Sequence, residues 1–120
     1  NDCKAYYKSN SYNIAKGLGL CVDELLKYIS PEKVLIVSPI FLGDAVWKEE
    51  FDPEFDAHSV DIAKGLFNEY KKVAETKGTN IISASNFARP SNVDQEHLTK
   101  EGHQLLAHAI YNAVITSNIV

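Results

Sequence analysis

The sequence predicts an α/β fold in which a parallel sheet lies between layers of helices. Two short apolar segments, 33–38 and 80–84, alternate with three longer segments whose apolar residues recur every three or four positions. The first short segment contains Val-Leu-Ile-Val, and such an unbroken apolar run is typical of a strand that is covered on both faces. The order helix–strand–helix–strand–helix therefore indicates the back half of an α/β sandwich.

The first helix is predicted over residues 12–29, with Ser11 available as its N-cap. It should end before Pro31, because a residue that precedes proline is biased away from helical dihedral angles. Its apolar positions fall on one stripe, which we expect to be buried: Ile14, Leu18, Cys21, Val22, Leu25 and Ile29.

The segment 39–56 follows the first strand and is long for a connection between a strand and a helix. Aromatic residues at the density found here argue against disorder. Two interpretations stay open for its part 42–55. It forms the wall or lid of a substrate pocket, with Trp47 and Phe51 as contact residues, or it packs over the end of the sheet or on another subunit.

The second helix is predicted over residues 57–77, and Gly78 supplies its C-terminal stop. Its expected buried positions are Ile62, Leu66, Tyr70, Val73 and Ala74. After the second strand and a loop over 85–96, Thr99 can cap a last helix over 100–116. The buried face of that helix is predicted at Leu105, Leu106, Ala109, Ile110, Ala113 and Val114.

Length and composition place the chain among ordinary globular domains, since 45% of its 120 residues are hydrophobic and 23% are charged. Its net charge of −4, with scattered signs, argues against a nucleic-acid or anionic-membrane surface. No apolar run approaches the ~18 residues of a membrane span. The two cysteines, Cys3 and Cys21, are too few for a disulfide scaffold, so we expect free thiols and a cytoplasmic location.

The chain opens with Asn1-Asp2-Cys3-Lys4 and contains no methionine, which favours the middle of a longer domain. Two parallel strands are also too few to cover three amphipathic helices, because parallel sheets almost always contain several strands. We therefore expect the edge of the sheet next to the first strand to be unpaired, unless a front half supplies further strands.

The segment most suggestive of chemistry is Asp94-Gln95-Glu96-His97, which leads through Leu98 into the last helix. A carboxylate three residues before a histidine can hold the imidazole in one tautomer and stabilise its protonated form, which prepares it as a general base. Taken alone, a surface aspartate followed by a helix-capping segment explains the same pattern more simply.

A metal site built from the acidic and histidine side chains of 94–103 is a further alternative, because His97 and Glu101 lie one helical turn apart. No second group of ligands with the usual metal spacing occurs elsewhere, so no metal is expected. The remaining histidines are interpreted as surface or packing residues: His58, His103 and His108.

Together these motifs resemble the SGNH hydrolases, also called GDSL-type esterases and lipases. Their third conserved block ends in Gly-x-Asn-Asp, like Asn1-Asp2, and their fifth is Asp-x-x-His followed by Thr or Ser and a later Gly, like Asp94–Thr99 with Gly102. Val34–Pro39 looks like their fourth-strand segment, and Asn1–Tyr7 is similar to the bacterial arylesterase and acetyl-esterase branch. The resemblance covers essentially the whole chain, and the order and spacing of the short motifs carry it.

The resemblance implies a flavodoxin-like three-layer α/β/α sandwich of which residues 1–120 form the C-terminal half. It also implies a serine esterase or lipase that acts on small carboxylic esters, by hydrolysis or by acyl transfer. In such an enzyme His97 is the base, Asp94 orients it, and Asn1 donates its side-chain amide to the oxyanion. No cofactor is implied. The expected partners are a small ester substrate, the upstream half of the domain and further copies of the chain.

The chain departs from the family because it has no Gly-Asp-Ser block, so the serine nucleophile and one oxyanion donor are missing. Ser38, Ser83 and Ser85 lie at or just beyond strand ends, where the sites of open α/β sheets collect. None of them occupies a strand-to-helix elbow, and we expect the chain alone to be inactive. The alternative function is a non-catalytic flavodoxin-like binding or interaction module, which needs no nucleophile.

Overall fold

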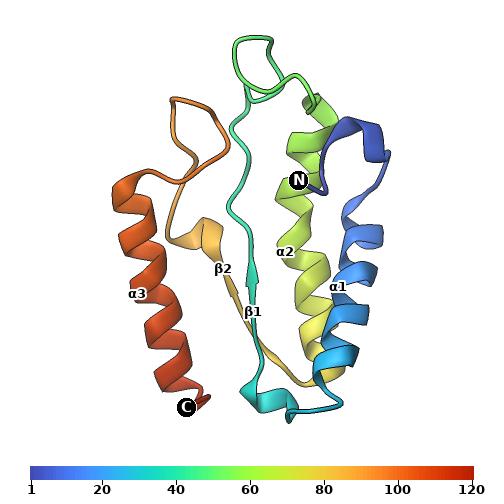
Figure 1. Cartoon of the computed structure of the whole chain (residues 1–120), viewed down its shortest axis with the longest axis vertical. Helices are drawn as coiled ribbons and strands as arrows, with labels where there is room; N and C mark the ends of the chain where they lie inside the picture. Colours follow the sequence, from blue (N-terminus) through green and yellow to red (C-terminus); the bar gives the residue numbers. More distant parts are fainter.

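The computed structural model describes residues 1–120 and contains the predicted elements in the predicted order. Helices and strands follow one another as α1 (Ser11–Leu25), β1 (Leu35–Ser38), α2 (Ala57–Lys77), β2 (Asn80–Ser83) and α3 (Lys100–Thr116). Figure 1 shows α1 and α2 on one side of the two strands and α3 on the other. The helices therefore form two layers around the sheet, as predicted.

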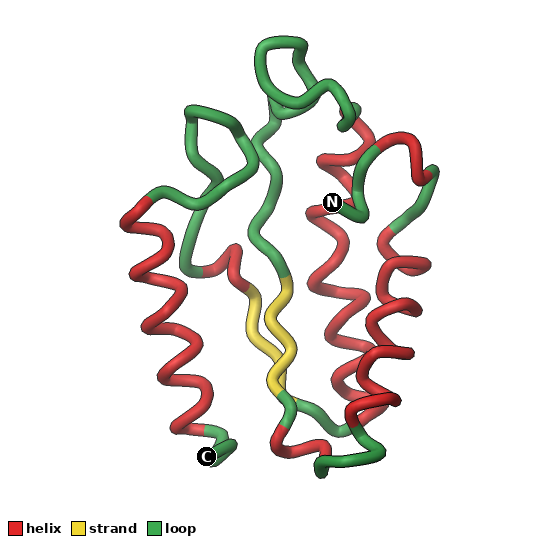
Figure 2. Tube along the Cα trace, in the orientation of Figure 1, coloured by secondary structure: helices red, strands yellow, loops and turns green.

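The strands β1 and β2 form a parallel sheet in which Leu35 pairs with Asn80 and Ser38 with Ser83. Each strand has one neighbour, so the outer edge of β1 is unpaired, as expected for a sheet of two strands. Parallel strands bring the segments that follow them to the same end of the sheet. Figure 2 shows the long loops gathered at this carboxyl end, and these loops carry the candidate site.

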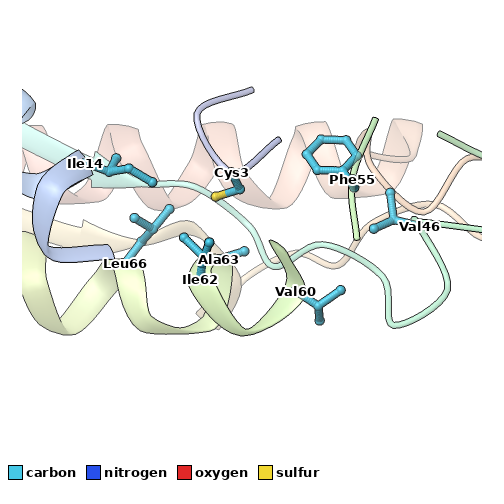
Figure 3. Close-up of a cluster of buried hydrophobic side chains, with 8 residues drawn as sticks. All are labelled: Cys3, Ile14, Val46, Phe55, Val60, Ile62, Ala63 and Leu66. Atoms are coloured by element: carbon cyan, nitrogen blue, oxygen red, sulfur yellow. The ribbon is translucent and has the colours of Figure 1, made fainter. Parts of the chain in front are cut away.

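Two buried clusters lie on the side of the sheet that α1 and α2 cover. In the smaller cluster, Ile36 of β1 packs with Val22 of α1 and Ala74 of α2. The larger cluster, drawn in Figure 3, joins the N-terminal segment, α1, α2 and the loop 39–56 through Cys3, Ile14, Val46, Phe55, Val60, Ile62, Ala63 and Leu66. Within the chain, the loop therefore packs on the N-terminal segment, α1 and α2, and its two predicted interpretations both stay open.

Strand β1 is buried on one face only. Ile36 and Ser38 are buried, whereas Leu35 and Val37 are half-buried. Because alternate side chains of a strand point to opposite faces, Leu35 and Val37 face away from the cluster around Ile36. The prediction that β1 is covered on both faces is therefore correct for the face towards α1 and α2. The opposite face is only half-buried, because α3 is the single helix on that side.

The predicted stripe of α1 is only partly buried. Ile14 and Val22 are buried, but Cys21, Leu25 and Ile29 are exposed. The helix ends at Leu25, four residues before the predicted end, so Ile29 no longer follows the helical period. Cys21 and Leu25 remain in solvent because α1 packs mainly against one neighbour, α2, and its buried stripe is narrow.

The start of α1 also differs from the prediction, since its N-cap is Asn10 and not Ser11. The side chain of Asn10 accepts a hydrogen bond from the backbone N–H of Asn13 at 2.8 Å. The hydroxyl of Ser11 instead donates to the carbonyl oxygen of Ile62 at 2.9 Å. This serine therefore ties α1 to α2.

Helices α2 and α3 have their predicted bounds, and their termini are built as predicted. Gly78 ends α2 in the left-handed conformation with φ 72°, and the hydroxyl oxygen of Thr99 accepts from the N–H of Gly102 at 3.0 Å. On α3, Ala109 is buried, but Leu105 is 55% exposed and its predicted burial is wrong. The fully buried positions of α3 are instead the small residues Gly102 and Ala109.

None of the helices is both long and apolar enough to cross a membrane. Both cysteine thiols are free, as predicted: Cys3 is buried and Cys21 is exposed.

Candidate active site

The turn that contains Asp94 and His97 lies beyond the carboxyl end of β2 and is held by main-chain hydrogen bonds. Pro90 and Leu98 form an isolated antiparallel bridge. Within it, the N–H of Ser91 donates to the carbonyl oxygen of His97 at 2.7 Å, and the N–H of Gln95 donates to the carbonyl oxygen of Ser91 at 2.8 Å. The segment thus folds back on itself before α3 begins, which presents the two side chains at the end of the sheet.

Asp94 binds His97 through both of its carboxylate oxygens. Oδ2 lies 2.9 Å from Nδ1 of the imidazole. Oδ1 accepts two hydrogen bonds of 3.0 Å, from the backbone N–H groups of Glu96 and His97. The carboxylate is therefore fixed by the backbone of the same turn that positions the histidine, and it can hold the imidazole with Nδ1 protonated and Nε2 free.

These contacts shift both pKa values in the directions that a stable ion pair requires. The backbone hydrogen bonds from Glu96 and His97 lower the pKa of Asp94 to about 2. The hydrogen bond that His97 Nδ1 donates to Asp94, followed by the charge of Glu96, raises the pKa of His97 above its ordinary 6.5. The Oε2 atom of Glu96 lies 3.9 Å from Nδ1 and acts through charge alone. The imidazole is 74% exposed, so Nε2 is open to a reacting group.

Asn1, the predicted oxyanion donor, lies in the N-terminal segment, which packs on α1 and α2 through Cys3. The backbone carbonyl of Asn1 accepts from the N–H of Lys4 at 2.9 Å, whereas its exposed side chain makes no hydrogen bond within the chain. The side-chain amide is therefore available as a donor.

Comparison with known proteins identifies structural relatives of this arrangement. The chain is similar to Est24, a carbohydrate acetylesterase from Sinorhizobium meliloti, with a TM-score of 0.83 and 29% identity over 97% of this chain and 56% of that chain. It is also similar to the native aryl esterase of M. smegmatis, with a TM-score of 0.81 and 24% identity over 97% and 56% of the two chains. The chain has the SGNH-hydrolase fold.

A further carbohydrate acetylesterase family member from Sinorhizobium meliloti matches with a TM-score of 0.79 and 20% identity, over 98% of this chain and 57% of that chain. No protein-family model and no curated protein matches the sequence. The recognised resemblance to SGNH hydrolases is thus confirmed by structure. The chain spans a little over half the length of these esterases.

The serines at the strand ends do not contact His97. Ser38 is 1% exposed, and Ser83 and Ser85 are also buried. The hydroxyl oxygens of Ser83 and Ser85 lie 2.7 Å from each other, and no serine side chain forms a hydrogen bond with His97. Within this chain the histidine therefore has an orienting carboxylate but no hydroxyl to activate.

The two aromatic residues predicted to contact substrate lie in different surroundings. The indole N–H of Trp47 donates to the carbonyl oxygen of Asp44 at 3.0 Å, and the side chain is largely exposed. Phe51 is half-buried. Neither lines the cavity beside the Asp94–His97 turn, where Phe41 and Leu42 are the apolar residues of the loop. The role of Trp47 and Phe51 stays a prediction.

Sequence reasoning missed the contact between Gly43 and Gln95. The N–H of Gly43 donates to the carbonyl oxygen of Gln95 at 2.7 Å. Gln95 has φ 63°, in the left-handed region that costs a residue with a side chain roughly 1–2 kcal/mol. The one sequence signal for such a close approach is a glycine in a loop that is rich in aromatic residues. This signal does not identify Gln95 as the residue that Gly43 contacts.

No group of three or more histidine, cysteine, aspartate or glutamate side chains is arranged to hold a metal ion. In the 94–103 segment, His97 is engaged by Asp94 and faced by Glu96. The arrangement is that of an imidazole paired with a carboxylate, which suits proton transfer.

Proposed function

We propose that this chain is the C-terminal portion of a serine esterase of the SGNH type, which hydrolyses small carboxylic esters or transfers their acyl groups. The observation that carries the proposal is the 2.9 Å contact between Asp94 Oδ2 and His97 Nδ1 at the carboxyl end of a parallel sheet. The esterase structures to which the chain is similar support the same reaction class.

In the proposed mechanism, His97 accepts the proton of a serine hydroxyl through Nε2 while the serine oxygen attacks the ester carbonyl carbon. Asp94 keeps Nδ1 protonated and stabilises the imidazolium that forms. The imidazolium then returns the proton to the leaving alkoxide, and water attacks the acyl-serine in the second half of the reaction. If an alcohol replaces that water, the acyl group is transferred.

The oxyanion of the tetrahedral intermediate needs donors that are already in place. Asn1 supplies its side-chain amide in this proposal, and one such donor is typically worth about 10²–10³ in rate. Its side-chain amide forms no hydrogen bond within the chain, which is consistent with this role. In this proposal the other hydrogen-bond donors to the oxyanion lie on the same segment as the serine.

The serine comes from a second segment of the same domain, which would also cover the unpaired edge of β1. The half-buried side chains of Leu35 and Val37 offer apolar surface for this contact. We further propose that the isolated chain associates with a second copy where this surface is left uncovered. A monodisperse monomer in light scattering would contradict the association.

The decisive experiment joins the chain to a serine-bearing front half, by co-expression, and measures hydrolysis of p-nitrophenyl acetate. His97→Ala should reduce kcat/KM by about 10³-fold or more, because the serine loses its base. His103→Ala, a matched exposed histidine on α3, should keep full activity. Full activity of His97→Ala would overturn the assignment, and hydrolysis by the chain alone would contradict a serine from outside it.

A further inference from the structure

A cavity of about 330 Å³ lies directly beside the Asp94–His97 turn, and the proposed reaction does not use it. It is bounded by the start of the 39–56 loop, by α2 and by the segment that precedes the turn. Its volume is at the lower end of the range typical for small-molecule sites, about 300–1,000 Å³. Gln95 forms part of its wall, so the cavity and the turn share a residue.

Arg89, the only arginine of the chain, lines this cavity. Its Nη1 group donates to the carbonyl oxygens of Ser85 and Ala88, the latter at 3.1 Å. Arg89 is exposed to solvent, and these two bonds from Nη1 orient its guanidinium. The remaining guanidinium donors make no hydrogen bond within the chain, and Arg89 belongs to none of the ion pairs. A fixed guanidinium with free donors is suited to a planar, bidentate anion.

The other charges at the cavity leave the positive charge of Arg89 uncompensated. Lys64 and Asp44 form an ion pair of 2.9 Å between Nζ and Oδ1 and largely neutralise each other. The charged lining is therefore two cations and one anion, a balance of +1, in a chain whose net charge is −4. This contrast favours an anionic ligand at this place.

The uncharged lining supplies donors and apolar surface. The side-chain amides of Asn92 and Gln95 form no hydrogen bond within the chain and face the same cavity as Arg89. Phe41 and Leu42 provide apolar area at its other wall. We infer that this cavity binds the anionic group of a small organic molecule, a carboxylate or a phosphate, through Arg89, with Asn92 and Gln95 as neutral donors.

The inference is tested by titrating the protein with succinate and, separately, with inorganic phosphate while its NMR signals are followed. Saturable shifts of the Arg89 Nε–H signal and of the side-chain amides of Asn92 and Gln95 are expected. Stronger binding of succinate would identify a carboxylate site, and stronger binding of phosphate a phosphate site. The absence of saturable shifts with both probes, at concentrations on the order of 10 mM, would overturn the inference.

Two variants separate loss of the site from loss of the fold. Arg89→Gln should weaken binding at least about tenfold, because hydrogen bonds to a charged group are lost. Asn92→Asp keeps the volume and the arginine but adds a negative charge at the cavity, so it should also weaken binding severalfold. Asn112→Asp makes the same change on the exposed side of α3 and should leave binding unaltered. Unchanged binding in both cavity variants would contradict the assignment.

The site is independent of the proposed esterase function. Binding is read from NMR shifts in the absence of ester, so a protein that binds the anion but does not hydrolyse esters would refute the esterase alone. A protein that hydrolyses esters but shows no saturable shift would refute the anion site alone.

Discussion

Gly43 and Gln95 meet backbone to backbone, with the N–H of Gly43 donating to the carbonyl oxygen of Gln95 at 2.7 Å. The side chain of Gln95 also packs on position 43, where an added Cβ atom would overlap Oε1 of Gln95 and lie 2.8 Å from its Cβ. The loop 39–56 is therefore held against the turn between Asp94 and His97. This backbone hydrogen bond connects the loop to the turn that carries Asp94 and His97.

Replacement of Gly43 by alanine should destabilise the protein by roughly 1–3 kcal/mol, because the added methyl group would overlap the side chain of Gln95, which must move together with the turn that holds its Cβ. Urea unfolding measures this loss as a lower midpoint at an unchanged slope. Gly17→Ala is the matched control, since a Cβ at Gly17 would meet no atom within 4 Å. In the middle of α1 it should stabilise by about 0.5–1 kcal/mol. Equal destabilisation by the two substitutions would contradict the steric explanation.

Replacement of Asp94 by asparagine should lower the pKa of His97 towards 6.5, because the hydrogen bond that the imidazole donates to the Asp94 carboxylate is the largest cause of the raised pKa. His97 must be neutral to accept a proton, so kcat/KM of the assembled esterase should increase with pH through the raised pKa. In the Asp94→Asn variant, this increase of kcat/KM with pH should occur at lower pH, and the maximal rate should fall. NMR titration of the His97 imidazole measures its pKa directly. An unchanged His97 pKa would show that Asp94 does not act on it.

The same pair predicts how stability depends on pH. The folded-state pKa of Asp94 is depressed to about 2, so its contribution to stability is present above its ordinary value of 3.8 and is lost as pH falls towards 2. The pKa of His97 is raised, so its contribution is present below 6.5 and is lost as pH rises through the folded-state value. Urea unfolding between pH 2 and 5 should therefore depend less on pH in Asp94→Asn than in the wild-type protein. The prediction fails if the two profiles are parallel.

Joint replacement of Trp47 and Phe51 by alanine should change either the acyl-chain-length preference of the assembled esterase or the oligomer size. The reason is that Trp47 is 40% exposed on a loop at the site end of the sheet and offers a large apolar surface. Hydrolysis of p-nitrophenyl esters of increasing length and light scattering measure the two outcomes. Tyr28→Ala removes an exposed aromatic ring after α1 and should change neither. The proposed role is wrong if the double variant also changes neither.

Local signals predicted much of this fold. The bounds of α2 and α3, the stop at Gly78 and the cap at Thr99 follow from residue periodicity and from the conformational preferences of glycine and threonine. The pairing of Asp94 with His97 was predictable for the same reason, because both residues belong to one turn and their contact depends on a spacing of three.

Burial was less predictable, because periodicity identifies an apolar face but not whether a neighbour covers it. Leu105 and Leu25 fit the apolar stripes of their helices and are nevertheless exposed. The reason is that no other helix lies beside α3 on its side of the sheet, and α1 packs mainly on α2. The N-cap at Asn10 was missed because Ser11 is an equally good cap by chemistry. Only the position of the Ile62 carbonyl shows that the hydroxyl of Ser11 is otherwise engaged.

By itself, the sequence determined the alternation of helices and strands and placed a carboxylate and an imidazole in one turn, because both features depend on residues close together in the chain. The tertiary structure decided which apolar faces are buried, how Gly43 docks on Gln95 and which side chains surround Arg89. These features join segments about fifty residues apart. Their geometry follows from the packing of whole elements, for which the local pattern of residues contains no signal.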